Sequence, residues 1–256
     1  MELNRDYESA AIYKWRKKRK KAFVLFICIV GICFLVTRMV RVEDKTTVKV
    51  HNMHTEQNEK AIRYVASNMI KEDPKIAITF DDGPSPTWTP LLLDGLKERN
   101  VKATFFLIGE NAKNNPELVK REAEEGHLIG NHTYHHVEIT QVPDETAQEE
   151  ILMTNEVITE ITGEEVSYMR PPFGVWQKNL ERKLDVMPVL WTIDPLDWTT
   201  DNEDEIINKV VTQAEENDII LLHDCYESSV NAALRIVDIL QKEGFGFVTV
   251  DELIMN

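Results

Sequence analysis

The sequence predicts an α/β fold built on a parallel sheet. From Pro74 onward, short apolar runs of strand length alternate with longer segments whose apolar residues recur at helical spacing. Repeated strand–helix units imply parallel strands joined by crossover helices, in either an open doubly wound sheet or a barrel. With 43% apolar and 29% charged residues, the 256-residue chain is globular in composition and long enough for one substantial core.

Each helix and strand is predicted from the spacing of its apolar residues. The predicted strands are Lys75–Phe80, Ala103–Ile108, Leu128–Gly130, Val166–Met169, Pro188–Ile193, Asp218–His223 and Phe247–Val250. The predicted helices are Thr89–Arg99, Pro116–Glu125, Asp144–Thr162, Asn179–Leu184, Glu203–Ala214 and Ser229–Lys242. Asp144 favours a helix start, and Gly126, Gly163 and Gly244 favour helix ends.

The charge of the chain is distributed unevenly. Residues 1–45 hold 11 of the 29 Lys and Arg residues but only 5 of the 44 Asp and Glu residues, which leaves a net charge of about −21 on the rest. Such an acidic body repels phosphate backbones, so we expect no nucleic-acid partner.

A membrane anchor is predicted next to the basic cluster. Residues 22–37 form a charge-free run of 16 residues, which as a helix is about 24 Å long, and residues 38–40 extend its apolar character. A cleaved signal peptide is the alternative, but residues 37–45 offer no small-x-small cleavage site. The positive-inside rule then places the N-terminus in the cytoplasm and the body outside the cell.

Four segments follow from this pattern. We expect a basic cytoplasmic tail over 1–21, a transmembrane signal-anchor over 22–40, a stalk over 41–73 with an amphipathic helix near Thr55–Lys71, and a catalytic domain over 74–256. Cys225 is the only cysteine beyond the anchor, so no disulfide can form within the outer domain. We expect a monomer whose stability comes from its core.

Ionisable or rigid motifs follow five of the predicted strands. Asp81-Asp82-Gly83-Pro84 follows the first strand, and residues 130–136, with three histidines, follow the third. The other three motifs are Arg170-Pro171-Pro172-Phe173-Gly174, Asp194-Pro195-Leu196-Asp197-Trp198 and Leu221-Leu222-His223-Asp224. Because reactive groups of parallel α/β folds gather where the strands end, these motifs predict one site.

A metal is the first chemistry that the motifs indicate. His132 and His136 are spaced i, i+4, which would place both imidazoles on one face of a helical turn. With Asp82 they make a set of two histidines and one carboxylate, which leaves coordination positions open for water and substrate. An ordinary Asp-Gly-Pro turn and a structural histidine are the alternatives for each motif taken alone.

Taken together and in order, the five motifs resemble the polysaccharide deacetylases of the NodB-homology group, carbohydrate esterase family 4. The resemblance covers roughly residues 75–252. It implies the family's distorted (β/α) barrel of about seven parallel strands, in place of an open sheet. The activity implied is metal-dependent removal of acetyl groups from N-acetylated amino sugars.

The resemblance also implies a role for each motif residue. Asp82, His132 and His136 look like ligands of one divalent metal, expected to be Zn²⁺, with Co²⁺ or Mn²⁺ as alternatives. Asp81 looks like the general base and His223 the general acid. The remaining roles are the following: Arg170 orients Asp81, Asp197 tunes His223, the backbone N–H of Phe173 stabilises the oxyanion, and Trp198, Leu221 and Pro172 form the substrate pocket. His135 competes with His136 as ligand, but the family pattern favours His136.

Peptidoglycan is the substrate we expect for an anchored enzyme that faces the cell wall. Chitin oligomers, poly-N-acetylglucosamine and O-acetylated xylan remain alternatives within the family. Two hypotheses from other functional classes also remain: a membrane-tethered glycan-binding protein without catalysis, and a hydrolase of a small amide.

Overall fold

All strands of the structure are parallel and belong to one sheet. The computed structural model describes residues 73–180 and 184–255. The strands are β1 (Lys75–Asp81), β2 (Thr104–Leu107), β3 (Leu128–Asn131), β4 (Tyr168–Met169), β5 (Met187–Pro188), β6 (Ile219–His223) and β7 (Gly246–Phe247). Their order is β5-β4-β3-β2-β1-β6, and β7 pairs with the first residues of β1. The predicted parallel α/β architecture is confirmed.

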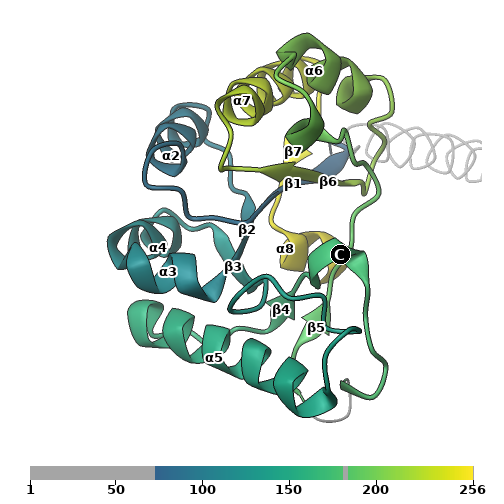
Figure 1. Ribbon diagram of the computed structural model, residues 1–256. Coiled ribbons are helices and arrows are strands. Elements are labelled where there is room, and N and C mark those ends of the chain that lie inside the picture. The colour runs from purple at the N-terminus through teal and green to yellow at the C-terminus, as the bar shows by residue number, and fades with distance from the viewer. Residues whose placement is uncertain (1–72, 181–183, 256) are drawn as a thin grey trace, which may run out of the picture. The chain divides into compact units, whose positions relative to one another are not determined.

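Helices pack against this sheet, most of them on its outer face (Figure 1). They are α2 (Thr89–Glu98), α3 (Gly109–Asn114), α4 (Pro116–Glu124), α5 (Asp144–Thr162), α6 (Glu203–Val211), α7 (Glu227–Lys242) and α8 (Val250–Met255), with 3-10 turns η1 (Pro172–Gly174) and η3 (Asp197–Thr199). In Figure 1, α2, α6 and α7 lie beside β1 and β6, whereas α3, α4 and α5 lie along β2, β3 and β4.

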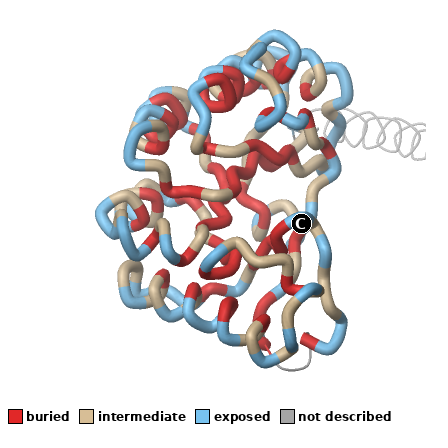
Figure 2. Tube along the Cα trace, in the orientation of Figure 1, coloured by how far each residue is buried: buried red, intermediate tan, exposed pale blue. Residues whose placement is uncertain are grey.

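The two faces of each strand have different neighbours because successive side chains point to opposite sides. In β1, Ile76, Ile78 and Phe80 join the large core under the helices, where Phe80 stacks on Phe105 of β2. Ala77 belongs instead to a small cluster on the other face, with Phe106 of β2. Figure 2 shows the buried residues concentrated in the strands and on the inward sides of the helices. The large apolar core therefore lies on the helix-covered face of the sheet, and the inner face carries other side chains.

The sheet curls until its two edges approach each other. After β5, the chain runs from the β4 edge to the β6 edge: Val189 donates to the carbonyl of Met169, and Ile193 forms a bridge with Ile220. The sequence predicts a continuous strand over Pro188–Ile193, but only the two ends of this segment pair. The carbonyls of Val189 and Leu190 accept hydrogen bonds from a buried arginine instead.

Most helices begin and end within a few residues of the prediction. Helix α5 has the predicted bounds, with acidic residues in its first turn and Gly163 at φ 78° after its last. Helix α3 was missed because six residues with two buried positions carry no readable period. The start of α8 was read as the end of a strand, although Thr249 donates its N–H to Glu252 in the manner of a capping box.

Several predictions lie outside the described residues. These are the cytoplasmic tail, the signal-anchor and the helix in the stalk, and the predicted helix Asn179–Leu184 falls largely on residues 181–183. Among the helices of residues 73–180 and 184–255, none is both long and apolar enough to cross a membrane.

The buried His127 generates a prediction about stability. Its Nδ1 accepts the N–H of Ala103 at 3.1 Å, and burial, helped by the charge of Lys102, lowers its pKa to about 4. An unfolded chain binds a proton near pH 6.5, so between about pH 6.5 and 4 only the unfolded state is protonated. We therefore expect the free energy of unfolding to fall as the pH falls, by up to about 1.4 kcal/mol per pH unit.

His127→Asn keeps an acceptor near the Nδ1 position but does not titrate. Denaturant unfolding at pH 7, 6, 5 and 4.5 should give a shallower pH slope for this variant than for the wild type. Parallel curves for the two proteins would contradict the assignment.

Candidate functional site

The inner face of the sheet ends in charged side chains. Asp81 lies on this face because it alternates with Ala77 and Thr79 along β1, and it pairs in register with His223 of β6. Both residues stand at the carboxyl ends of their strands. The predicted convergence of strand ends on one site is therefore present for these two strands.

Arg170 fills the interior of the curled sheet beneath the site. It is fully buried, and its Nη1 donates to Oδ1 of Asp81 and to Oγ1 of Thr79, each at 2.7 Å. Its guanidinium carbon lies 4.3 Å from the centre of the Phe106 ring. Burial lowers the pKa of Arg170, and the charge and hydrogen bond of Asp81 oppose that shift. The contact predicted between Arg170 and Asp81 is thus observed.

The loop after β1 holds Asp82 in an unusual backbone conformation. Asp82 has φ 72°, in the left-handed region, and its carbonyl accepts a hydrogen bond from Nδ2 of Asn111 at 2.8 Å. Gly83 leaves no room for a side chain, since a Cβ there would lie 2.6 Å from both carboxylate oxygens of Asp224. Asp224 in turn accepts a hydrogen bond from the hydroxyl of Thr89. Sequence reasoning gave no role to Asn111, Thr89 or Asp224, because none of them lies in the loop that they support.

The two predicted histidine ligands do converge, but not through a helical turn. Thr133 and His136 have φ 62° and 57°, and the segment from His132 to His136 is irregular. The expectation of an i, i+4 helical geometry was wrong. Instead, two left-handed residues turn the loop so that the rings of His132 and His136 lie 4.9 Å apart.

The donor set fits a divalent metal. Nε2 of His132 and Nε2 of His136 each lie 3.4 Å from Oδ1 of Asp82, and all three atoms fall within 4.8 Å of one another. Two ligands at about 2.1 Å from a tetrahedral zinc are about 3.4 Å apart. His132 donates through Nδ1 to the carbonyl of Arg170 at 2.7 Å. Its Nε2 therefore carries a lone pair, which could bind a cation shared with Oδ1 of Asp82.

The buried carboxylate oxygen of Asp82 supports the same conclusion. Oδ1 is buried and has no hydrogen-bond partner among the described residues. Burial acts to raise the pKa of Asp82, but His132, His223 and His136 together hold it below its usual value. An ionised, unpartnered oxygen that faces two imidazole nitrogens suits a cation between them. His135 points elsewhere: its Nδ1 lies 2.7 Å from Glu150.

A second charged pair lies across the site. Asp197 accepts the N–H of His223 through Oδ2 and contacts its Nδ1 through Oδ1, both at 2.8 Å. Burial lowers the pKa of His223, but the hydrogen bond and charge of Asp197, with the charges of Asp81 and Asp82, raise it to about 9. The imidazole is therefore arranged to carry a proton.

These groups open into a cavity of about 430 Å³. Its lining is Asp81, Asp82, His132, His136, Pro171, Phe173, Trp191, Asp194, Leu196, Trp198, Leu221, His223 and Tyr226. Of the three predicted pocket residues, Trp198 and Leu221 are present, whereas Pro172 is buried and its neighbour Pro171 takes part instead.

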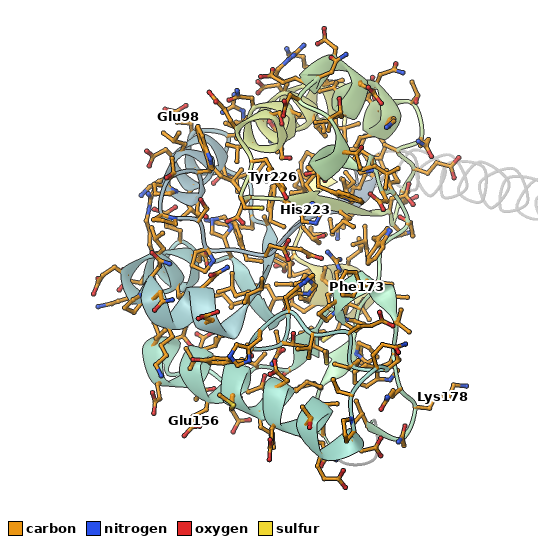
Figure 3. All side chains as sticks on the ribbon, viewed as in Figure 1. Glu98, Glu156, Phe173, Lys178, His223 and Tyr226 are labelled. Carbon is orange, nitrogen blue, oxygen red and sulfur yellow. The ribbon has the colours of Figure 1, made fainter. Side chains whose placement is uncertain are left out.

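Exposed aromatic rings stand at the rim of the cavity. Phe173 is 64% exposed and Trp198 57%. In Figure 3, Phe173 lies on one side of the site, and His223 with Tyr226 on the other. Sequence reasoning missed Tyr226, although it follows His223 by only three residues.

Cys225 lies beside the site but is not a reactive group. Burial, with the negative charges of Asp82, Asp224 and Asp197, raises the pKa of its thiol to about 12. Such a thiol stays protonated near neutral pH, where the thiolate would be the nucleophile.

Comparison with known proteins gives the same family as the motifs. Residues 68–189 match the family described as Polysaccharide deacetylase. A Bacillus cereus protein named peptidoglycan-N-acetylglucosamine deacetylase is 39% identical, over 75% of this chain and 93% of its own length. The Listeria monocytogenes peptidoglycan-N-acetylglucosamine deacetylase PgdA is 37% identical, over 82% of this chain but only 46% of its own length.

A solved structure supports the fold. Bacillus subtilis PdaC, a peptidoglycan deacetylase, superposes with a TM-score of 0.70 at 36% identity, covering 72% of this chain and 91% of the solved one. Its full sequence is named a peptidoglycan-N-acetylmuramic acid deacetylase, and this chain matches 38% of that length at 37% identity. The chain described here therefore belongs to the polysaccharide deacetylase family.

Proposed function

We propose that this protein is a metal-dependent N-deacetylase that removes acetyl groups from the amino sugars of peptidoglycan. One observation carries the proposal: a single cavity is lined by three side chains that could bind a metal, Asp82, His132 and His136. Beside them lie two hydrogen-bonded pairs, Asp81 with Arg170 and His223 with Asp197. The names of the relatives, which are deacetylases acting on peptidoglycan, support the reaction class and the substrate.

Asp82, His132 and His136 would hold the metal. When bound, a divalent cation supplies charge that acidifies water and polarises the acetamide carbonyl. Zn²⁺ suits two imidazoles and one carboxylate, and Co²⁺ and Mn²⁺ accept the same ligands.

Asp81 is proposed as the general base. Its Oδ1 is engaged by Arg170, which leaves Oδ2 to receive a proton, and that oxygen lies 3.8 Å from Nε2 of His132. The attacking water gives this proton to Asp81 as its oxygen bonds to the carbonyl carbon. Arg170 keeps the carboxylate from rotating away from the ligand set.

His223 is proposed as the general acid. Its raised pKa keeps the ring protonated at neutral pH, and the charge of a bound cation acts in the opposite direction. As the carbon–nitrogen bond breaks, His223 gives its proton to the sugar nitrogen, so that a free amine and acetate leave. Asp197 fixes the ring and stabilises its positive charge.

The remaining motif residues shape the site. The backbone N–H of Phe173 would stabilise the developing oxyanion. Trp198 and Leu221, with Pro171 in place of the predicted Pro172, would enclose the acetyl methyl group. The exposed rings at the rim favour a polymeric glycan over a small amide, because sugar faces stack on such rings. Chitin oligomers, poly-N-acetylglucosamine and O-acetylated xylan remain alternatives, and the relatives' names divide between the two peptidoglycan sugars.

The cell-wall side of the plasma membrane is the proposed location. The basic cluster and the apolar run of residues 22–40 support an uncleaved anchor, with residues 74–256 outside the cell. A wall polymer would then lie within reach of the active site.

The first test is acetate release from purified peptidoglycan and from N-acetylglucosamine oligomers, with Zn²⁺ or Co²⁺ added. We expect acetate from peptidoglycan, and a loss of about 100-fold or more in kcat for Asp81→Asn, because no base remains. Asp204→Asn, at an exposed position of α6, serves as the control. Glycan binding by the wild type without any acetate would establish the binding-protein alternative instead.

The ligand assignment makes a second prediction. His132→Ala and His136→Ala should abolish Zn²⁺ binding in a chelator-competition titration, since each removes one of three protein ligands. His135→Ala should retain Zn²⁺ binding and most of the activity. Loss of the metal in the His135 variant alone would overturn the assignment.

The proposed location can be tested by adding protease to intact cells. The domain beyond residue 45 should be digested, while an epitope at the N-terminus should stay protected. Soluble enzyme in the medium would show that the anchor is cleaved.

A further inference from the structure

A buried carboxylate outside the cavity contacts the metal-ligand loop. Glu150 lies on α5 and is 7% exposed. A carboxylate is rarely buried unless hydrogen bonds compensate the loss of water, so its partners indicate what it does. No cation is among the partners of Glu150 in the described part of the chain.

All three side-chain contacts of Glu150 are made with the segment between the two histidine ligands. Oε2 accepts the backbone N–H groups of Tyr134 at 3.0 Å and of His135 at 2.8 Å. Oε1 lies 2.7 Å from Nδ1 of His135, which must donate because a carboxylate oxygen accepts. One carboxylate thus holds two consecutive peptide groups and one ring.

This segment needs such support because of its backbone. Thr133 and His136, on either side of the two held residues, both have positive φ, which residues with a Cβ rarely adopt unless their surroundings impose it. At the first of these positions, the N–H of Thr133 is held by Oδ1 of Asn131 at 2.7 Å. At the second, the preceding residues are held by Glu150.

The two ligands differ in how they are fixed. His132 has a partner of its own, since its Nδ1 donates to the carbonyl of Arg170. For His136, no hydrogen bond to Nδ1 is found within residues 73–180 and 184–255. Its ring lies against those of His132 and Phe173, and its Nε2 faces Oδ1 of Asp82 at 3.4 Å. The position of His136 therefore depends on the backbone that precedes it.

We infer that Glu150 is a positioning residue for the metal site: its carboxylate fixes the Tyr134–His135 backbone so that His136 faces Asp82. This role rests on the proposed function, because it takes the ligand set from there. The inference adds to the site a residue of α5 that does not line the cavity.

The test is Zn²⁺ affinity in Glu150→Gln. The amide has one acceptor oxygen, so its NH₂ group must face either the two backbone N–H groups or the donating nitrogen of His135. We expect the dissociation constant for Zn²⁺, measured by competition with a chelating dye, to rise about 10-fold or more, as is typical when an outer partner of a ligand is lost. Glu149→Gln, the exposed neighbour on the same helix, removes the same charge and should bind like the wild type.

Two further measurements separate positioning from mere stability. The melting temperature of the metal-free variants shows whether the fold is affected, and a lowered value with an unchanged Zn²⁺ affinity would overturn the inference. If Glu150→Gln does not fold, Glu150→Asp keeps the charge but is one methylene too short for all three contacts, and a wild-type affinity there would also overturn it. A wild type that binds no Zn²⁺ would instead refute the proposed function.

Discussion

The hydrogen-bonded ion pair between Arg170 and Asp81 connects the fold to the site. The guanidinium lies inside the curled sheet, where it contacts the end of β1, the carbonyls of Val189 and Leu190, and the ring of Phe106. A buried ion pair is tolerated only when its remaining donors and acceptors are satisfied. The same contacts that satisfy the arginine therefore hold the crossing segment after β5 and aim the carboxylate of Asp81.

The charges around the cavity are balanced only in part by the protein. Asp81 is paired with Arg170 and Asp197 with His223, whereas the ion-pair distances of Asp82 within the described residues are all to imidazole nitrogens. Asp82 is thus the carboxylate whose charge the proposed metal would compensate. The two neighbouring pairs are held by hydrogen bonds within the chain, so the proposed base and acid are already oriented by their partners.

Much of this arrangement was predictable because strand alternation and strand-end motifs are local signals. The period of two along β1 assigns Ile76, Ile78 and Phe80 to one face and Asp81 to the other, and α5 was predicted to the residue. The segment after β5 was not predictable, because its missing strand pairing depends on Arg170, which is distant in sequence. Strand β4 begins two residues later than predicted.

The geometry of the site departed from sequence reasoning where the backbone is left-handed. The spacing of His132 and His136 correctly predicted that the two imidazoles lie close together, both facing Asp82, but a helical turn was the wrong cause. Left-handed Thr133 and His136 are held by contacts from Asn131 and Glu150, and no local propensity signals them. Support for Asp82 by Asn111, and the cavity residues Trp191 and Tyr226, likewise arise only when separate loops meet.

The central position of β1 has a consequence for how the domain is made. This strand leaves the ribosome before its partners, yet one of its sides pairs with β6, more than 130 residues later, and the other with β2 and, at its first residues, β7. Local helices and the β1–β2–β3 pairs can form early, but one edge of β1 stays unpaired until the C-terminal part of the chain is synthesised. Contacts of such high sequence separation slow folding. An incomplete chain that ends after α5 would carry an open, apolar strand edge of the kind that promotes aggregation.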